Sequence, residues 1–244
     1  MPRFKLLITY DGTNYQGWQI QKDGRTVQGI IENTFSDLSG INERIRVNGS
    51  GRTDAGVHAL GQVAHIDFET NLNIQALKNA LNARLPEDCR IILIEQVDKN
   101  FHSRYDAKKR YYRYQCCESG SLLFRNQCWI INNIDILCLN ELASYLVGNH
   151  DFLSFCKYRE EMENTYCEIF ESKWLVENNM IIFKISANRF LHHMIRYLVG
   201  TMIGVCQGRI SAKEFKLLLN YPKKNVQILK APPQGLFLEK INYE

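Results

Sequence analysis

Asp54 is the only carboxylate in a glycine-rich segment, residues 49–58, which reads Gly-Ser-Gly-Arg-Thr-Asp-Ala-Gly-Val-His. Glycine permits positive φ angles and the close approach of another chain. A loop of this kind suits the presentation of one carboxylate to a ligand that fits tightly against the backbone. An ordinary aspartate turn near a hairpin explains the same residues equally well, because glycine and aspartate are common in turns.

Residues 101–114 interleave cations with aromatic side chains, from Phe-His-Ser-Arg-Tyr to Arg-Tyr-Tyr-Arg-Tyr. Cations neutralise phosphates and tyrosine rings stack on unpaired bases, a pattern typical of single-stranded or flipped-out nucleotides. An edge strand with solvated cations on one face and core tyrosines on the other is the alternative. Alternation places Tyr112 and Tyr114 on one face and Tyr111 and Arg113 on the other, so at least one tyrosine should be structural.

Residues 190–205 are apolar on nearly every side of a predicted helix, which indicates burial. Arg196 then needs an acidic or hydrogen-bonding partner, and Asp54 is a candidate. Helical spacing puts Arg196 in one stripe with His192, Gly200 and Gly204, where the glycines would admit another segment. A packing stripe with a structural ion pair is the alternative. On a helix His192 and His193 point about 100° apart, which makes a poor metal pair.

Other chemistries lack their motifs. The chain has no phosphate-binding P-loop, no His-Glu-x-x-His zinc helix and no Gly-x-Ser-x-Gly elbow. Its 8 cysteines include no Cys-x-x-Cys pair, so we interpret them as reduced thiols in the core. We therefore expect neither a cofactor nor a metal.

The composition limits the class of protein in which these motifs occur. A chain of 244 residues with 45% hydrophobic residues is able to bury a core, and a formal charge of +4 permits an anionic partner without proving one. No charged-then-apolar leader opens the chain, and every apolar run is shorter than the roughly 18 residues of a membrane span. We expect a cytoplasmic protein that does not enter the membrane.

Two runs of elements in β-α-β-β-α-β order must position the candidate residues. The first has expected strands at 4–10, 44–48, 62–68 and 90–97 and helices at 27–38 and 74–85. The second has expected strands at 110–116, 169–176, 181–187 and 235–241 and helices at 139–146 and 190–205. We predict an α+β fold of two related halves, 1–105 and 106–244, each an antiparallel sheet with helices on one face, and a cleft between them.

Six blocks along the whole chain resemble the TruA tRNA pseudouridine synthases in order and spacing. They lie at residues 11–19, 51–58, 101–104, 150–152, 190–196 and 231–236. The nine-residue run from Gly51 to Ala59 is highly specific, whereas Asp-Gly or His-Asp-Phe alone would mean little.

The resemblance implies isomerisation of uridine to pseudouridine at positions 38, 39 and 40 of the tRNA anticodon arm, by a homodimer. It implies that Asp54 attacks the nucleotide, that Tyr112 stacks on the target base, and that Arg196 pairs with the catalytic carboxylate. An arginine neighbour keeps a carboxylate ionised, and a flipped base recovers its stacking on an aromatic ring. Arg52 is expected to contact the RNA. Residues 157–168 are rich in glutamate where the family has a more basic insertion, which predicts a weaker RNA grip there.

Two rival functions remain at this stage. A non-catalytic RNA-binding protein or tRNA chaperone would not need a carboxylate that repels phosphate. A carboxylate-dependent hydrolase of nucleosides or glycosides would usually place a second acid opposite the first, and the loop around Asp54 contains none.

Overall fold

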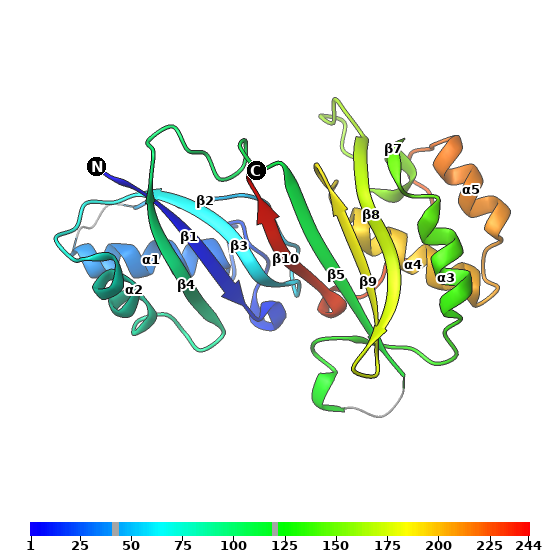
Figure 1. Cartoon of the computed structure of the whole chain (residues 1–244), viewed down its shortest axis with the longest axis horizontal. Helices are drawn as coiled ribbons and strands as arrows, with labels where there is room; N and C mark the ends of the chain where they lie inside the picture. Colours follow the sequence, from blue (N-terminus) through cyan, green and yellow to red (C-terminus); the bar gives the residue numbers. More distant parts are fainter. Residues whose placement is uncertain (41–43, 119–121) are drawn as a thin grey trace. The chain divides into compact units, whose positions relative to one another are not determined.

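The computed structural model describes residues 1–40, 44–118 and 122–244. The chain forms two compact units. Unit 1 contains residues 1–108 together with 237–244, and unit 2 contains residues 109–236. Both units combine a sheet with helices, which confirms the predicted α+β class (Figure 1).

The sheet of unit 1 has the strand order β4-β1-β3-β10, with β2 beside β3. β1 is antiparallel to β3 and β4, and β10 is parallel to β3. Two helices pack on one face of this sheet (Figure 1). The elements are β1 (Arg3–Tyr10), α1 (Val27–Ser39), β2 (Asn48–Gly49), β3 (His58–Asp67), α2 (Ile74–Asn82), β4 (Cys89–Val97) and β10 (Leu236–Asn242).

Local sequence explains most of these elements. In β1 every second residue is buried, so the strand turns one apolar face to the core. Thr26 caps α1 by accepting a hydrogen bond from the Gly29 N–H, and Gly40 ends that helix in the left-handed region. Asn73 caps α2 in the same way through the Ala76 N–H.

The strand predicted at 44–48 is wrong except at its last residue. Val47 donates its N–H to the Glu32 carboxylate and accepts at its carbonyl from the Gln28 side chain. Both side chains come from α1 and both are buried. Because they take the backbone groups that a sheet partner would need, Val47 lies against the helix and pairing begins at β2.

The sheet of unit 2 has the order β5-β9-β8-β7, with β6 parallel to β5. β5 (Lys109–Cys117), β9 (Met180–Ala187), β8 (Tyr166–Glu177) and β7 (Gly148–Asp151) are antiparallel to their neighbours. Three helices pack on one face: α3 (Ile136–Ser144), α4 (Met194–Cys206) and α5 (Ala212–Asn220) (Figure 1). Neither α5 nor β7 nor the short β6 (Trp129–Ile130) was predicted from the sequence, although Ser211 and Glu214 carry a capping-box signal for α5.

The predicted helix at 190–205 starts four residues too early. Observed α4 begins at Met194, and the preceding His193 has a φ of 64°, which no helical residue adopts. His192 therefore does not belong to the helical stripe, and the angle of about 100° expected between the two histidines does not apply.

The interpretation of the cysteines as reduced core thiols holds for Cys89, Cys116 and Cys167, which are free and buried, but it is wrong for four others. The structure pairs Cys117 with Cys128 and Cys138 with Cys206 as disulfides, with Cα–Cα distances of 6.3 and 6.1 Å. The partners lie 11 and 68 residues apart in the chain, so spacing alone gave no sign of either pair.

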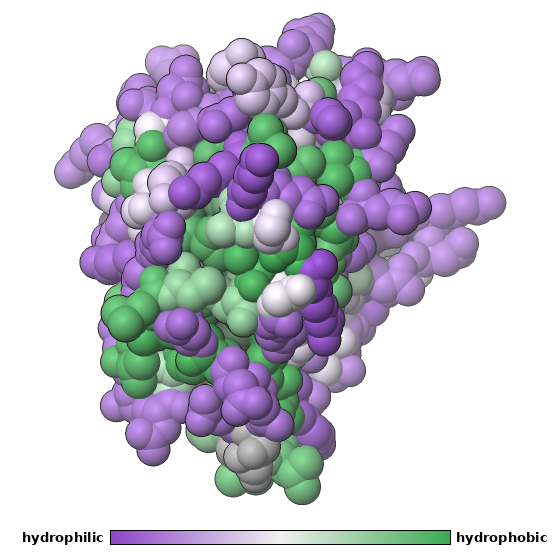
Figure 2. Space-filling view, turned by 90° about the vertical axis from the view of Figure 1, so that its right-hand side faces the viewer, coloured by the Kyte–Doolittle hydropathy of each residue, from purple (hydrophilic) through white to green (hydrophobic). Residues whose placement is uncertain are grey.

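The side of unit 2 that carries α3 and α5 mixes polar and apolar surface (Figure 2). Leu137 and Leu217 are exposed on these two helices. Among the residues described, no helix combines the length and the apolar character that crossing a membrane requires.

Candidate functional site

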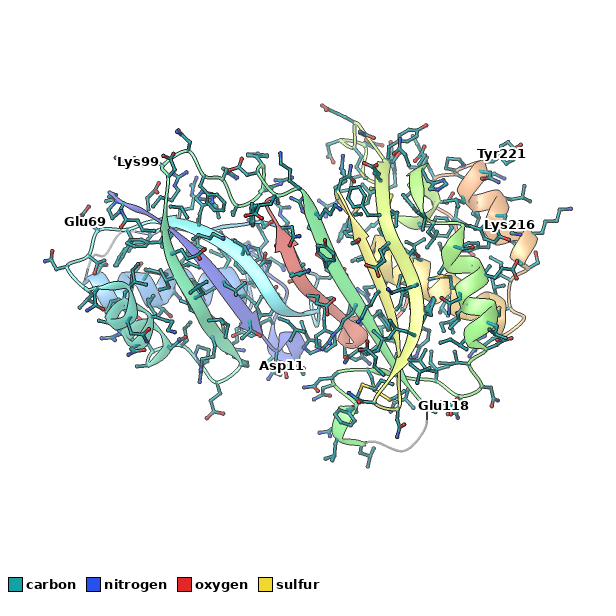
Figure 3. The ribbon with its side chains drawn as sticks, in the orientation of Figure 1. Asp11, Glu69, Lys99, Glu118, Lys216 and Tyr221 are labelled. Atoms are coloured by element: carbon teal, nitrogen blue, oxygen red, sulfur yellow. A yellow bond between two sulfur atoms is a disulfide. The ribbon has the colours of Figure 1, made fainter. Side chains whose placement is uncertain are left out.

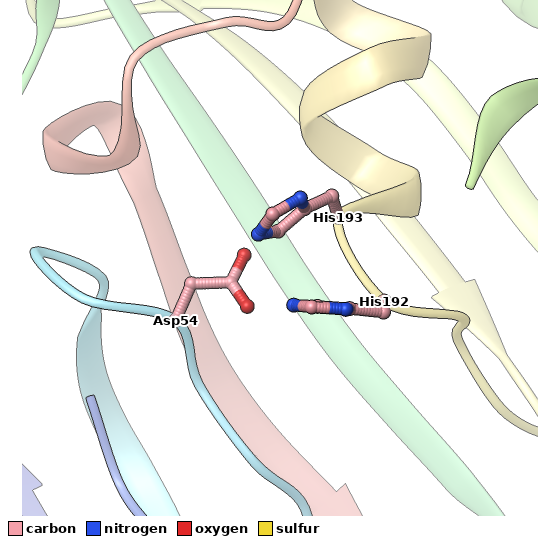
Figure 4. A group of neighbouring side chains, drawn as sticks. All are labelled: Asp54, His192 and His193. Atoms are coloured by element: carbon pink, nitrogen blue, oxygen red, sulfur yellow. The ribbon is translucent and has the colours of Figure 1, made fainter. Parts of the chain in front are cut away.

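The loop that carries Asp54 is tied to the segment that follows β1, entirely within unit 1. The Thr53 carbonyl accepts from the Trp18 N–H at 3.1 Å, and the Thr53 hydroxyl lies 2.8 Å from the Tyr10 hydroxyl. Beyond Asp54, the Gly56 N–H donates to the Tyr15 carbonyl at 3.2 Å. Bonds on both sides of Asp54 therefore define the path of its backbone, and its carboxylate extends from that loop (Figure 4).

Two glycines outside the loop make this contact possible. A Cβ added to Gly12 would collide with the Val57 carbonyl. A Cβ added to Gly17 would lie 2.6 Å from the Thr53 carbonyl oxygen, and Gly17 has a φ of 93°. The Asp-Gly and Tyr-Gln-Gly-Trp block of residues 11–18 thus shapes the loop, a role the sequence analysis did not assign.

The turn after β1 is closed by Asp11, which lies at the end of that strand (Figure 3). Its carboxylate accepts from the N–H and the hydroxyl of Thr13, at 2.9 and 2.6 Å. The turn continues into a 3-10 helix, η1 (Gly12–Asn14), from which the Gly12 N–H donates to His58 Nδ1 at 3.0 Å. His58 begins β3, so the turn is linked to the strand that follows Asp54.

Burial differs along the loop itself. Thr53 is buried, Asp54 is half-buried and Arg52 is exposed. A side chain that is neither sealed in the core nor fully solvated suits a reacting carboxylate, because a ligand is able to reach it. The exposed cation two residues earlier is accessible to an anionic ligand.

The tyrosines of β5 follow the predicted alternation. Tyr112 and Tyr114 are buried, while Tyr111 and Arg113 on the opposite face are partly exposed. The Tyr112 ring meets the Phe190 ring edge to face, with centroids 5.1 Å apart. Tyr114 is completely buried, which confirms that at least one tyrosine of this segment is structural.

Arg196 lies in the first turn of α4 and is only 8% exposed. Its Nε donates to the Ala231 carbonyl at 2.8 Å, and its own carbonyl accepts from the Ala231 N–H at 2.9 Å. A Cβ on Gly200 would collide with the Leu229 carbonyl, whereas one on Gly204 would make only an ordinary contact at 3.5 Å. Gly200 therefore admits the segment that binds Arg196, as the stripe predicted.

Tyr114 holds the far end of the same segment. Its hydroxyl donates to the Pro232 carbonyl at 2.9 Å. A Cβ on Gly235 would lie 2.6 Å from the Tyr114 ring, so glycine is required there for packing. Residues 231–235, ending in the 3-10 helix η4 (Pro233–Gly235), are thus anchored by Arg196 and by Tyr114. The sequence showed this Ala-Pro-Pro-Gln-Gly block without showing what it touches.

The rings of the two histidines before α4 lie against each other, with centroids 3.9 Å apart and planes inclined by 45° (Figure 4). Burial, together with the neighbouring charges of His192, Lys230 and Arg196, lowers the pKa of His193 to about 3. His193 is therefore neutral near pH 7. A neutral imidazole adds no further positive charge to those of Arg196 and Lys230 in this part of unit 2.

The four predicted site residues divide between the units. Asp54 and Arg52 belong to unit 1, and Tyr112 and Arg196 belong to unit 2. The ion pair between Asp54 and Arg196 stays a prediction. The structure adds the supporting residues that sequence reasoning missed: Gly12, Gly17 and Trp18 around the aspartate loop, and Tyr114, Ala231 and Gly235 around the arginine.

Comparison with known proteins agrees with these features. The family model of the tRNA pseudouridine synthases matches residues 6–106 and 142–244. The tRNA pseudouridine synthase A of Exiguobacterium sibiricum is 37% identical over 100% of this chain and 97% of its own length. The proteins of the same name from Pseudothermotoga lettingae and Ehrlichia chaffeensis are 36% and 38% identical, over 100% and 99% of this chain and 100% of their own lengths.

Among solved structures, a chain of a Cbf5-Nop10-Gar1 complex aligns with 96% of this chain and 57% of its own length. The identity is 9% and the TM-score is 0.40, too low to support an argument. The sequence relationships are sufficient by themselves, because they extend over the full chain and include the Asp54 loop. The chain belongs to the tRNA pseudouridine synthase family.

Proposed function

We propose that the protein isomerises uridine to pseudouridine in tRNA, at positions 38, 39 and 40 of the anticodon arm. The observation that carries the proposal is the loop of residues 51–59, which holds one carboxylate between bonds from Trp18 and Tyr15. Relatives that align over the full chain are named tRNA pseudouridine synthase A, which supports the same reaction.

The reaction needs one well-placed carboxylate. The bond between N1 of uracil and C1′ of ribose breaks, the base turns, and a bond between C5 and C1′ forms. The proton on C5 is lost and N1 gains one, so the product is an isomer. In our proposal Asp54 is the nucleophile. Attack on the pyrimidine ring, attack on C1′ and elimination to a glycal all require a carboxylate at nearly the same position.

The other site residues receive supporting roles in this proposal. Arg196 pairs with Asp54 and keeps it ionised, Tyr112 stacks on the flipped base, and Arg52 contacts the RNA. The burial of Arg196 and its bond to Ala231 support its role, because a guanidinium held in one plane directs its charge to one place. We also propose a cytoplasmic homodimer, as in the family that the sequence resembles.

The test is chemical mapping of pseudouridine in tRNA transcripts incubated with the purified protein, beside Asp54→Asn. The substitution removes the charge with little change of shape, so we expect folding and tRNA binding to persist and pseudouridine in the anticodon arm to disappear. Modification by the variant would remove Asp54 from the mechanism. If both proteins bind tRNA and neither modifies it, the chain acts as an RNA-binding protein.

A further inference from the structure

Residues 101–106, which follow β4 in unit 1, form a turn that the proposed catalytic roles leave unexplained. Tyr105 is 74% exposed, more than any other large aromatic side chain in the described part of the chain. Its ring lies on the His102 ring, with centroids 4.3 Å apart and planes inclined by 33°. The Arg104 guanidinium lies 5.7 Å from the centroid of the Tyr105 ring. An exposed aromatic ring with a second ring beneath it and a cation beside it is thus present on the surface.

Local hydrogen bonds hold His102 in this position. Its Nδ1 accepts from the backbone N–H groups of Arg104 and Tyr105, at 3.1 and 3.3 Å. The backbone N–H of His102 donates to the Asp106 carboxylate at 2.8 Å. The lower ring of the stack is therefore oriented by the backbone of the turn.

A buried contact fastens the turn to the sheet. Ser103 is completely buried, and its N–H donates to His65 Nδ1 at 3.1 Å. The Ser103 hydroxyl donates to the Asn48 carbonyl at 2.7 Å, and the Ser103 carbonyl accepts from the Tyr243 hydroxyl at 2.8 Å. Burial lowers the pKa of His65 to about 4, with the Arg3 charge as the next cause, so His65 remains a neutral acceptor near pH 7. Strands β2, β3 and the C-terminal residues all hold this turn.

We propose that Tyr105, backed by His102, is a stacking site for one nucleobase of the tRNA, separate from the base that reacts. The site rests on the proposed function for its ligand, because that function makes RNA the partner. The base lies on the open face of the Tyr105 ring, and Arg104 supplies positive charge for a neighbouring phosphate.

Two physical arguments favour a nucleobase as the occupant. Base–aromatic stacking tolerates any sequence, since every base has a π-face, which suits an enzyme proposed to act at three neighbouring positions. The ring is also held in place before binding, so little side-chain entropy is lost when a base arrives. A purely apolar partner would gain nothing from the cation at the edge of this aromatic face.

The experiment compares tRNA binding by wild-type protein, Tyr105→Ala, Tyr105→Phe and Tyr221→Ala in a filter-binding assay. Tyr221 is a matched control, 68% exposed and next to the end of α5 (Figure 3). We expect Tyr105→Ala to raise the Kd for tRNA about 5- to 150-fold, the range that corresponds to the loss of one base stack. Tyr105→Phe keeps the ring and should stay within about 2-fold of wild type, as should Tyr221→Ala.

Unchanged affinity of Tyr105→Ala would overturn the stacking site, and so would an equal loss in Tyr105→Phe, which would indicate a hydroxyl contact instead. Sedimentation of the same variants tests a protein partner: a change of oligomeric state in Tyr105→Ala would assign the ring to an interface between copies. Since binding is measured separately from pseudouridine formation, a protein that binds tRNA through Tyr105 but modifies nothing would refute the proposed reaction only.

Discussion

The loop of Asp54 and the start of α4 place opposite charges by different means. Around Asp54 the hydrogen bonds are made by backbone groups: Trp18 and Tyr15 bind the backbone on either side of Asp54. The Asp54 side chain itself remains half-buried. At Arg196 the side chain itself is bound, through Nε, and it is only 8% exposed. In both places a glycine lets a second segment approach, Gly17 in unit 1 and Gly200 in unit 2.

The difference follows from the two side chains. A carboxylate has a short stem, so fixing the backbone of its loop largely fixes the charge. An arginine has a long stem with several rotatable bonds, and its direction is set only when the guanidinium is held. Damage to the backbone contact should therefore misplace Asp54 directly, whereas damage near Arg196 should act through the segment that binds its Nε.

The largest effect is expected from Gly17→Ala. The substitution imposes a positive φ of 93° on alanine and brings a Cβ to 2.6 Å from the Thr53 carbonyl. We expect a loss of about 2–4 kcal/mol in the free energy of unfolding and at least about 100-fold in kcat, because the loop that carries Asp54 must move. Urea unfolding and initial rates of pseudouridine formation at saturating tRNA measure the two quantities.

Gly40→Ala separates the two causes. Gly40 also has a positive φ, 67°, but nothing lies within 4 Å of an added Cβ. Gly40→Ala should lower the free energy of unfolding by about 1 kcal/mol and leave the activity of the folded protein normal. If the two variants lose equal stability and activity, close packing of Gly17 against the loop does not position Asp54.

Gly200→Ala is the matching change beside Arg196. Its Cβ collides with the Leu229 carbonyl, so residues 229–231 must shift and carry the partner of the Nε bond with them. We expect a loss of about 1–3 kcal/mol of stability and a kcat lower by roughly 10-fold or more. Denaturant titration and initial rates with saturating tRNA test this.

The control lies four residues further along α4. Gly204→Ala adds a Cβ at 3.5 Å from Ile210, an ordinary contact, and alanine favours helix by about 1 kcal/mol over glycine. This variant should be as stable as wild type or more so, with unchanged kcat. If Gly200→Ala instead matches Gly204→Ala in stability and kcat, residues 229–231 are able to shift without disturbing Arg196.

Sequence patterns predicted what depends on near neighbours. Alternation located β1 and the buried face of Tyr112 and Tyr114, and apolar spacing located α1. Sequence patterns did not predict the structure where it depends on residues that are distant in the chain. Nothing near residue 47 reveals that Glu32 takes its N–H, and the apolar run before Met194 does not reveal the left-handed His193 that delays α4. Gly17 and Gly235 look like ordinary loop glycines until the segments opposite them are known.

The smallest effect, and the sharpest test of the comparison, is expected from Tyr114→Phe. It removes the hydroxyl that holds the Pro232 carbonyl and leaves the ring packed against Gly235. Tyr243→Phe is the matched control, since the Tyr243 hydroxyl binds the Ser103 carbonyl at 2.8 Å within unit 1. Each variant should lose about 1 kcal/mol of stability in thermal or urea unfolding, because each loses one neutral hydrogen bond.

Their activities should differ. In Tyr114→Phe, residues 231–235 lose their hydrogen bond to the Tyr114 hydroxyl and hold Arg196 less firmly. The kcat of this variant should therefore fall several-fold, while its KM for tRNA stays near that of wild type. Tyr243→Phe should keep the wild-type kcat. Equal kcat values in the two variants would mean that the Tyr114 hydroxyl only stabilises the fold. In that case the hydrogen bond between Arg196 and Ala231 is sufficient to direct the guanidinium, without the bond from Tyr114 to Pro232.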